Sequence, residues 1–212
     1  MRAFVAIDLP EPIRDQLSEL NQRLRVPGLR ASWSPPQNLH LTLRFLGDVS
    51  DDRLACIGDH LDSALGSMQS FPLNVAGLGA FPSLRNPSVV WVGAGPLDGG
   101  LQAVQTAAEQ GASSIGLPRE TRKFHPHITL ARIKDRQGVA ALKSRIVAER
   151  DIDIGEFSAR CVSLYTSQLT PKGAEHTPVR IIELRGSAND ARMNDAIGNS
   201  DRTTTEEQAD HD

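Results

Sequence analysis

One tetrapeptide occurs twice along the chain, as His40-Leu-Thr-Leu and, 87 residues later, as His127-Ile-Thr-Leu. In an extended strand the side chains at i and i+2 share a face, so each histidine points to the same side as the threonine that follows it. The aliphatic residues of both copies then face the core. A single copy is typical of any amphipathic strand, but two copies predict two equivalent strands that each present an imidazole and a hydroxyl.

The surroundings of the two copies also repeat. Hydrophobic periodicity predicts strands at residues 3–8, 39–46, 71–80, 88–92, 126–133, 152–164 and 179–184. Helices are expected between Pro12 and Pro27, after Ser50, from Pro96 to about Gly111, and over residues 138–148. Each half therefore consists of strand, helix, His-x-Thr strand, helix and strand.

Equal spacing strengthens this repeat, because Phe4 lies 36 positions before His40 and Trp91 lies 36 positions before His127. We therefore expect an α+β fold in which an internal duplication produces two pseudo-symmetric lobes, with halves at roughly 1–86 and 87–186. Each lobe is a mainly antiparallel sheet with helices on its outer face, and the active-site cleft lies between the lobes. The alternative is coincidence, since strand–helix–strand units are common.

Composition sets the class of protein. A chain of 212 residues with 39% hydrophobic and 23% charged residues can bury a substantial core. No apolar run approaches the roughly 18 residues of a membrane span, and an acid at Asp8 interrupts the apolar start that a signal peptide would continue. We expect no membrane association, a cytoplasmic location, and buried free thiols at Cys56 and Cys161.

Charge is unevenly distributed. Residues 187–212 hold seven acidic residues, two basic residues and few apolar ones, and this composition predicts a disordered acidic tail. The remaining 186 residues hold 21 bases and 19 acids, a balance too weak for a general nucleic-acid binder. It remains compatible with a local cationic pocket for one phosphate.

The two His-x-Thr motifs favour one kind of chemistry. Two imidazoles that face a shared space supply a general base and a general acid near neutral pH. The hydroxyls of Thr42 and Thr129 can donate hydrogen bonds to an oxyanion without adding charge. Phosphodiester cleavage by His40 and His127 fits this set, and the chain has neither a Gly-x-Ser-x-Gly elbow nor a Walker loop.

Two arginines follow the histidines closely. Strand parity places Arg44 on the catalytic face if the strand stays regular, and it turns Arg132 away unless a bulge reverses it. The alternative for either side chain is a solvated charge on the surface. We keep both arginines as candidate substrate contacts.

Aromatic residues make up only 4% of the chain, so those near the histidines are candidates for stacking on a base. Trp33 and Phe124 lead into the two His-x-Thr strands, and each either contacts the substrate or packs in the core. Phe4 and Phe45 are expected in the core. His125 shares a strand face with His127, and with His40 it raises the alternative of a metal site. The first copy lacks an equivalent second ligand, so we expect no metal and no cofactor.

Five stretches resemble the two-histidine phosphoesterase superfamily, and within it the RNA 2′,3′-cyclic phosphodiesterases, also called 2′-5′ RNA ligase-like proteins. These stretches are RAFVAI (2–7), WSPPQNLHLTLRFLG (33–47), GAFPS (79–83), FHPHITLAR (124–132) and SQLTPKG (167–173). One departure is His176, where the family pattern suggests a tyrosine.

The resemblance implies a bilobal fold and metal-independent hydrolysis of RNA 2′,3′-cyclic phosphate ends to 2′-phosphates, with a weak reverse 2′-5′ ligation. It also implies that His40 and His127 form the acid–base pair, that Thr42 and Thr129 bind phosphate, and that Arg132 contacts it. We expect His127 to activate water and His40 to protonate the leaving oxygen, although pseudo-symmetry leaves the reverse open.

The expected partner is an RNA with a 2′,3′-cyclic phosphate end or a related cyclic nucleotide, bound by a monomer. Two alternatives remain: a cyclic phosphodiesterase acting on a small nucleotide or an ADP-ribose derivative, and a non-catalytic protein that binds RNA ends.

Overall fold

Alternating apolar residues form one long antiparallel sheet in the computed structural model, which describes residues 1–171 and 173–186. The acidic tail expected at residues 187–212 lies outside the described residues. The strands are β1 (Arg2–Asp8), β2 (Ala31–Trp33), β3 (His40–Asp48), β4 (Phe71–Phe81), β5 (Val89–Gly95), β6 (His127–Ile133), β7 (Asp153–Ala159), β8 (Cys161–Thr170) and β9 (Gly173–Glu183). The helices are α1 (Glu11–Leu24), α2 (Asp51–Leu65), α3 (Gly99–Ser114) and α4 (Val139–Ala148), with a 3₁₀ turn at Pro36–Asn38.

The strands run in the spatial order β7-β4-β5-β6-β3-β1-β8-β9, with β2 paired to β6. Every pair between these strands is antiparallel. The two His-x-Thr strands, β3 and β6, lie side by side at the middle of this order and are joined by one residue pair, Leu41 with Ile128. Two lobes therefore meet at the repeated motif, which confirms the α+β, antiparallel and bilobal prediction.

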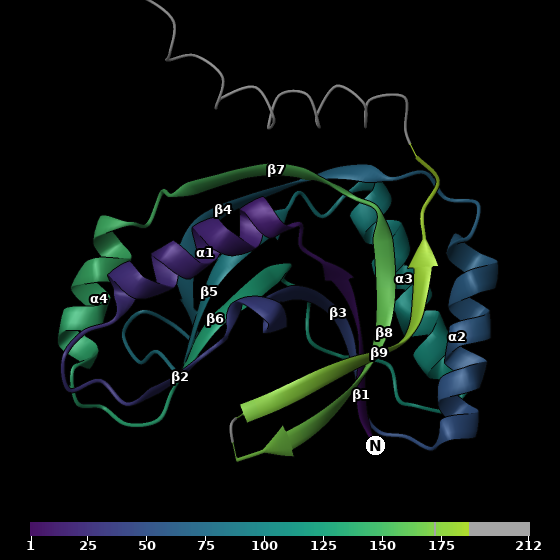
Figure 1. Ribbon diagram of the computed structural model, residues 1–212, viewed down its shortest axis with the longest axis horizontal. Helices are drawn as coiled ribbons and strands as arrows, with labels where there is room; N and C mark the ends of the chain where they lie inside the picture. The colour runs from purple at the N-terminus through teal and green to yellow at the C-terminus, as the bar shows by residue number, and fades with distance from the viewer. Residues whose placement is uncertain (172, 187–212) are drawn as a thin grey trace, which may run out of the picture.

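The two halves of the sequence exchange elements between the lobes. Strand β4 comes from the first half but pairs with β5 and β7, whereas β8 comes from the second half and pairs with β1. Helix α1 packs against β7 and α4, and α3 packs against β3 and α2 (Figure 1). Each lobe therefore contains strands from both halves of the sequence.

The expected strand at residues 152–164 is two strands, which break at Arg160. Strand β7 ends at one edge of the sheet and β8 begins beside β1 in the other lobe. No glycine or proline marks the break, and the only local signal is that the buried apolar residues change parity there, from Phe157 and Ala159 to Val162 and Leu164.

Apolar residues fill the space between sheet and helices. Ile13, Leu17, Leu20 and Leu24 of α1 and Leu54, Ile57, Leu61 and Leu65 of α2 are buried at helical spacing, as predicted. Leu41, Leu43, Ile128 and Leu130 are buried from the strands that carry the histidines. Within the described residues no helix combines the length and the apolarity of a membrane span.

Candidate active site

The pairing of Leu41 with Ile128 determines how the two motifs face each other. Around this antiparallel pair, His40 falls opposite Thr129 and Thr42 falls opposite His127. Since both paired residues are fully buried on one face, the four polar side chains lie together on the other face. Two imidazoles and two hydroxyls thus occupy diagonal positions across the seam between the lobes.

Each histidine is held by the backbone two residues before it. Nδ1 of His127 lies 2.6 Å from the carbonyl oxygen of His125, and the His40 ring is hydrogen-bonded to the backbone of Asn38. A carbonyl only accepts, so Nδ1 of His127 carries the proton and Nε2 of the neutral ring has a free lone pair. Because this arrangement recurs in both halves, it is part of the repeat.

Aromatic rings contact both imidazoles. Phe4 stacks on His40 with ring centroids 4.7 Å apart, and Phe81 meets His127 edge-on at 4.9 Å. Trp91 lies 6.3 Å from His127, also edge-on. Phe4 and Trp91 are the residues 36 positions before each histidine, so the equal spacing was the available signal for these contacts, although Phe4 was expected only in the core.

Burial shifts the titration of both histidines. Burial, reinforced by nearby His176, lowers the pKa of His40 from 6.5 to about 4. The pKa of His127 is also lowered, mainly by burial, with the hydrogen bond to the His125 carbonyl opposing this and the charge of Arg132 adding to it. Both imidazoles are therefore predominantly neutral at pH 7 in the free protein.

A carboxylate network that the sequence reading missed lies behind His40. Asp8 pairs with His40 in the register of β1 and β3. Its carboxylate accepts hydrogen bonds from the hydroxyls of Ser163, at 2.6 Å, and Tyr165, at 2.7 Å. Burial and Asp8 together raise the pKa of Tyr165, which keeps the phenol protonated and able to donate.

His176, the one noted departure from the family pattern, belongs to this surround. Its ring lies edge-on to His40, with centroids 5.5 Å apart, and edge-on to Phe4 at 5.0 Å. Burial lowers the pKa of His176. The residue therefore contacts a candidate catalytic ring.

A cavity of about 1220 Å³ opens beside the seam. Its lining contains most of the candidate residues: Thr42, Arg44, Phe124, His125, His127, Thr129 and Arg132. His40 is not among the lining residues, since Phe4 and His176 pack against its ring. Trp33 also lies elsewhere, packed against the core with the Arg25 guanidinium 5.4 Å from its ring centroid.

Bulges explain which side chains reach this cavity. In β6 the pairing with β5 shifts between Val90 and Trp91, so Leu130 and Ala131 are both buried and Arg132 returns to the Thr129 face. The bulge that the sequence left open is therefore present.

Strand β3 shifts in the same way, where Val5 pairs with Arg44 and Ala6 with Thr42. Phe45 then occupies the position equivalent to Arg132, lines the cavity and is 60% exposed. The expectation that Phe45 packs in the core is wrong, because the extra residue in the strand reverses its parity.

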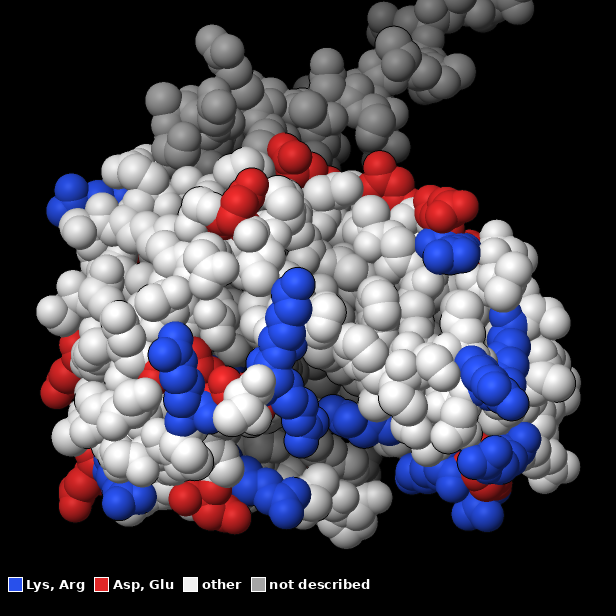
Figure 2. Space-filling model, turned by 180° about the vertical axis from the view of Figure 1, so that it is seen from behind, with Lys and Arg blue, Asp and Glu red and all other residues white. Residues whose placement is uncertain are grey.

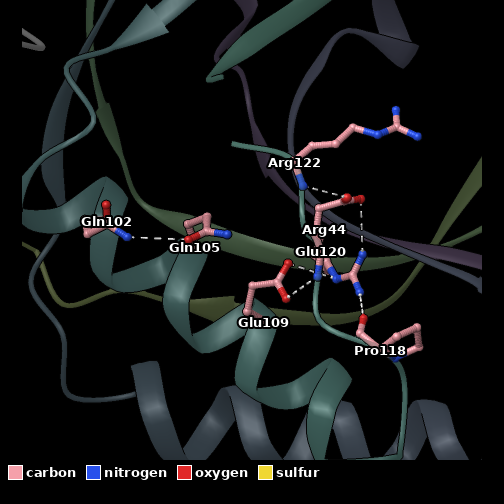
Figure 3. Close-up of polar contacts among 7 residues, drawn as sticks. All are labelled: Arg44, Gln102, Gln105, Glu109, Pro118, Glu120 and Arg122. Atoms are coloured by element: carbon pink, nitrogen blue, oxygen red, sulfur yellow. Dashed lines mark hydrogen bonds and ion pairs between the residues drawn. The ribbon is translucent and has the colours of Figure 1, made fainter. Parts of the chain in front are cut away.

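The same irregularity redirects Arg44. Its Nε lies 3.0 Å from Glu109 of α3, its Nη1 lies 3.8 Å from Glu120, and its Nη2 donates to the Pro118 carbonyl at 2.5 Å (Figure 3). The side chain is only 11% exposed. Arg44 lines the cavity, but the strand is not regular as the parity argument required, and the guanidinium is occupied by protein groups.

No group of three or more His, Cys, Asp or Glu side chains within residues 1–171 and 173–186 is arranged to hold a metal ion. In particular, His125 contributes its carbonyl to orient His127. The geometry matches acid–base work on an oxyanion more closely than metal coordination.

Comparison with known proteins gives the family. Residues 7–91 and 92–174 each match the model of the LigT like Phosphoesterase family, so the two halves of the chain are two copies of one unit. The RNA 2′,3′-cyclic phosphodiesterase of Methanocaldococcus jannaschii is 34% identical over 173 residues, which cover 82% of this chain and 95% of that protein.

Two solved structures share the fold. TT0787 of Thermus thermophilus superposes with a TM-score of 0.73 at 29% identity, over 88% of this chain and all of that one. E. coli LigT complexed with 3′-AMP gives a TM-score of 0.69 at 26% identity, over 86% and 97% of the two chains. The duplicated sheet, the paired His-x-Thr strands and these matches together show that the chain belongs to the LigT-like phosphoesterase family.

Proposed function

We propose that this protein hydrolyses the 2′,3′-cyclic phosphate at the end of an RNA to a 2′-phosphate, without a metal ion. The observation that carries the proposal is the seam itself, where the Leu41–Ile128 pair brings two oriented imidazoles and two threonine hydroxyls to one face. The M. jannaschii relative is named an RNA 2′,3′-cyclic phosphodiesterase, and E. coli LigT was solved with 3′-AMP, which carries its phosphate on the 3′ oxygen of the ribose.

In this mechanism Thr42 and Thr129 donate hydrogen bonds to the non-bridging oxygens of the cyclic phosphate. One imidazole removes a proton from water, which attacks phosphorus, and the other protonates the 3′ oxygen as its bond to phosphorus breaks. Arg132 lines the cavity near His127, and in this mechanism it neutralises charge on the phosphate.

The lowered pKa values bear on which histidine is the base. The chemistry needs one neutral ring and one protonated ring, and burial suppresses the charge of His40 most strongly, with a pKa of about 4. This favours His40 as the base and His127 as the acid, the reverse of the order expected from the sequence.

By microscopic reversibility the same pair serves the reverse 2′-5′ ligation, with a 5′-hydroxyl in place of water. The chain builds both halves of the centre itself, which supports a monomer as the active form.

The test offers a short RNA with a 2′,3′-cyclic end, with and without EDTA, and identifies the product by chromatography. His40→Ala and His127→Ala should each lower kcat by about 10²- to 10⁴-fold while the thermal midpoint stays close to that of the wild type. His60→Ala, at the contact between α2 and α3, is the matched control and should keep full turnover. A 3′-phosphate product, loss of activity in EDTA, or near-normal turnover in either active-site variant would contradict the proposal.

A further inference from the structure

The cavity extends well beyond Thr42, His127 and Thr129. We propose that it contains a second subsite, which binds the nucleotides preceding the cyclic end, and that Arg44 is the positioning residue that holds the basic segment of this subsite, residues 118–124. The inference rests on the proposed function. It specifies that the substrate is an RNA chain and not a free cyclic mononucleotide.

Size is the first support. Pockets for small ligands typically occupy about 300–1000 Å³, whereas this cavity measures about 1220 Å³. Its lining continues from Thr42, His127 and Thr129 along one face of α3 to segment 118–124; the α3 residues are Gln102, Gln105, Thr106, Glu109, Gln110 and Ser113. The seam alone accounts for one phosphate, so most of the lining has no role in binding the reacting group.

Charge is the second support. The lining holds five Lys or Arg side chains and two carboxylates. Both carboxylates, Glu109 and Glu120, face Arg44. Within the described chain no ion pair engages the other four cations, which are Arg119, Arg122, Lys123 and Arg132. Cationic side chains border the hollow on this face of the molecule (Figure 2), and such a set suits the phosphates of a single strand.

An exposed aromatic ring adds a place for a base. Phe45 lines the cavity at 60% exposure, and Phe124, at the end of the segment that carries the cations, also lines it. A solvent-exposed phenyl ring gains little from water but stacks on any nucleobase, which is how single strands are bound without sequence preference. Interleaved rings and cations indicate a strand of nucleotides.

Arg44 fixes this segment to β3. Its guanidinium bridges Glu109 of α3, Glu120 and the Pro118 carbonyl, while the backbone N–H of Arg122 donates to Glu120 at 3.1 Å. Figure 3 shows the Arg122 side chain extending away from this cluster. Arg44 therefore neutralises the two acids that would repel phosphate and orders the loop that presents Arg122 and Lys123.

The test compares kcat/KM for adenosine 2′,3′-cyclic phosphate and for a six-nucleotide RNA with a 2′,3′-cyclic end. The wild type should prefer the hexanucleotide at least about tenfold, the scale of one or two stacked bases. Arg122→Gln/Lys123→Gln should reduce that preference at least about fivefold through KM, with a salt slope of log kcat/KM smaller by about 1.4 for two lost contacts. Arg53→Gln/Arg150→Gln removes the same charge outside the cavity and should leave the preference and the slope unchanged.

A second variant tests Arg44. Arg44→Met/Glu109→Gln removes the ion pair without leaving a buried lone charge, and it should raise KM for the hexanucleotide as the Arg122/Lys123 variant does, with less effect on the mononucleotide. If it lowers only the thermal midpoint and the preference for the hexanucleotide remains, Arg44 has no positioning role.

The two proposals fail differently. A wild type that hydrolyses both substrates with equal kcat/KM refutes the second subsite and leaves the proposed function standing. Equal losses in the Arg122/Lys123 variant and in the Arg53/Arg150 control also refute the subsite. A wild type that hydrolyses neither substrate overturns the proposed function and the subsite together.

Discussion

Protonation of His40 should cost the folded protein much of its stability in acid. The ring is packed against Phe4 and His176, and its folded pKa is about 4, against 6.5 for the free side chain. Between these values the unfolded chain binds a proton that the folded chain does not, so the free energy of unfolding falls as the pH falls from 6.5 to 4. At about 1.4 kcal/mol for each pH unit, the loss is about 3 kcal/mol.

His40→Gln isolates this contribution, because glutamine fills similar space and does not titrate. Urea unfolding of wild type and variant at a series of pH values gives the difference between their free energies of unfolding. The free energy of unfolding of the wild type minus that of the variant should decrease by about 3 kcal/mol from pH 7 to pH 4 and level off below pH 4. His125→Gln, at an exposed histidine, is the control for the loss of any imidazole. A His40→Gln difference that stays constant within about 1 kcal/mol would refute the reasoning, since it would mean that the ring becomes protonated in the folded protein as easily as in water.

Two further substitutions test the seam and the packing around His127. Ile128→Ala empties a fully buried position in the pair that joins β3 and β6, so it should lower the free energy of unfolding in urea by about 2–5 kcal/mol and also lower kcat. The control, Ile146→Ala in α4, empties an equally buried position and should cost as much stability while kcat is kept. Equal kcat values in the two variants would contradict this. Gly79→Ala should cost about 1–3 kcal/mol and shift the tryptophan emission, because an added Cβ overlaps the Trp91 ring, and an unchanged spectrum would show that the ring does not need this space.

Most of the elements, and the repeat that contains the two His-x-Thr strands, could be predicted from the sequence. Alternation within the two His-x-Thr motifs and helical spacing in α1 and α2 are local signals, and they predict β3, β6 and these two helices. The family resemblance added the likeness to cyclic phosphodiesterases. These predictions depend on residues close together in the chain.

What could not be predicted depends on pairing. A bulge inserts one residue into a strand without a sequence signature, so parity placed Phe45 in the core and left Arg132 undecided. The Asp8 network joins β1 to β8, more than 150 residues away, and nothing near Asp8 indicates its hydroxyl partners. The occupation of Arg44 by Glu109 and Glu120 likewise arises only when α3 packs against β3.

The exchange of β4 and α1 between the lobes has an evolutionary consequence. A polypeptide carrying only one half would lack a strand of its own sheet and a helix to cover it, and a second copy could supply both by swapping. A single-repeat ancestor with this geometry would have been an intertwined homodimer with a symmetric catalytic centre at the subunit boundary. In a chain that carries both copies, each side of that centre can differ, as Phe45 and Arg132 do at equivalent positions.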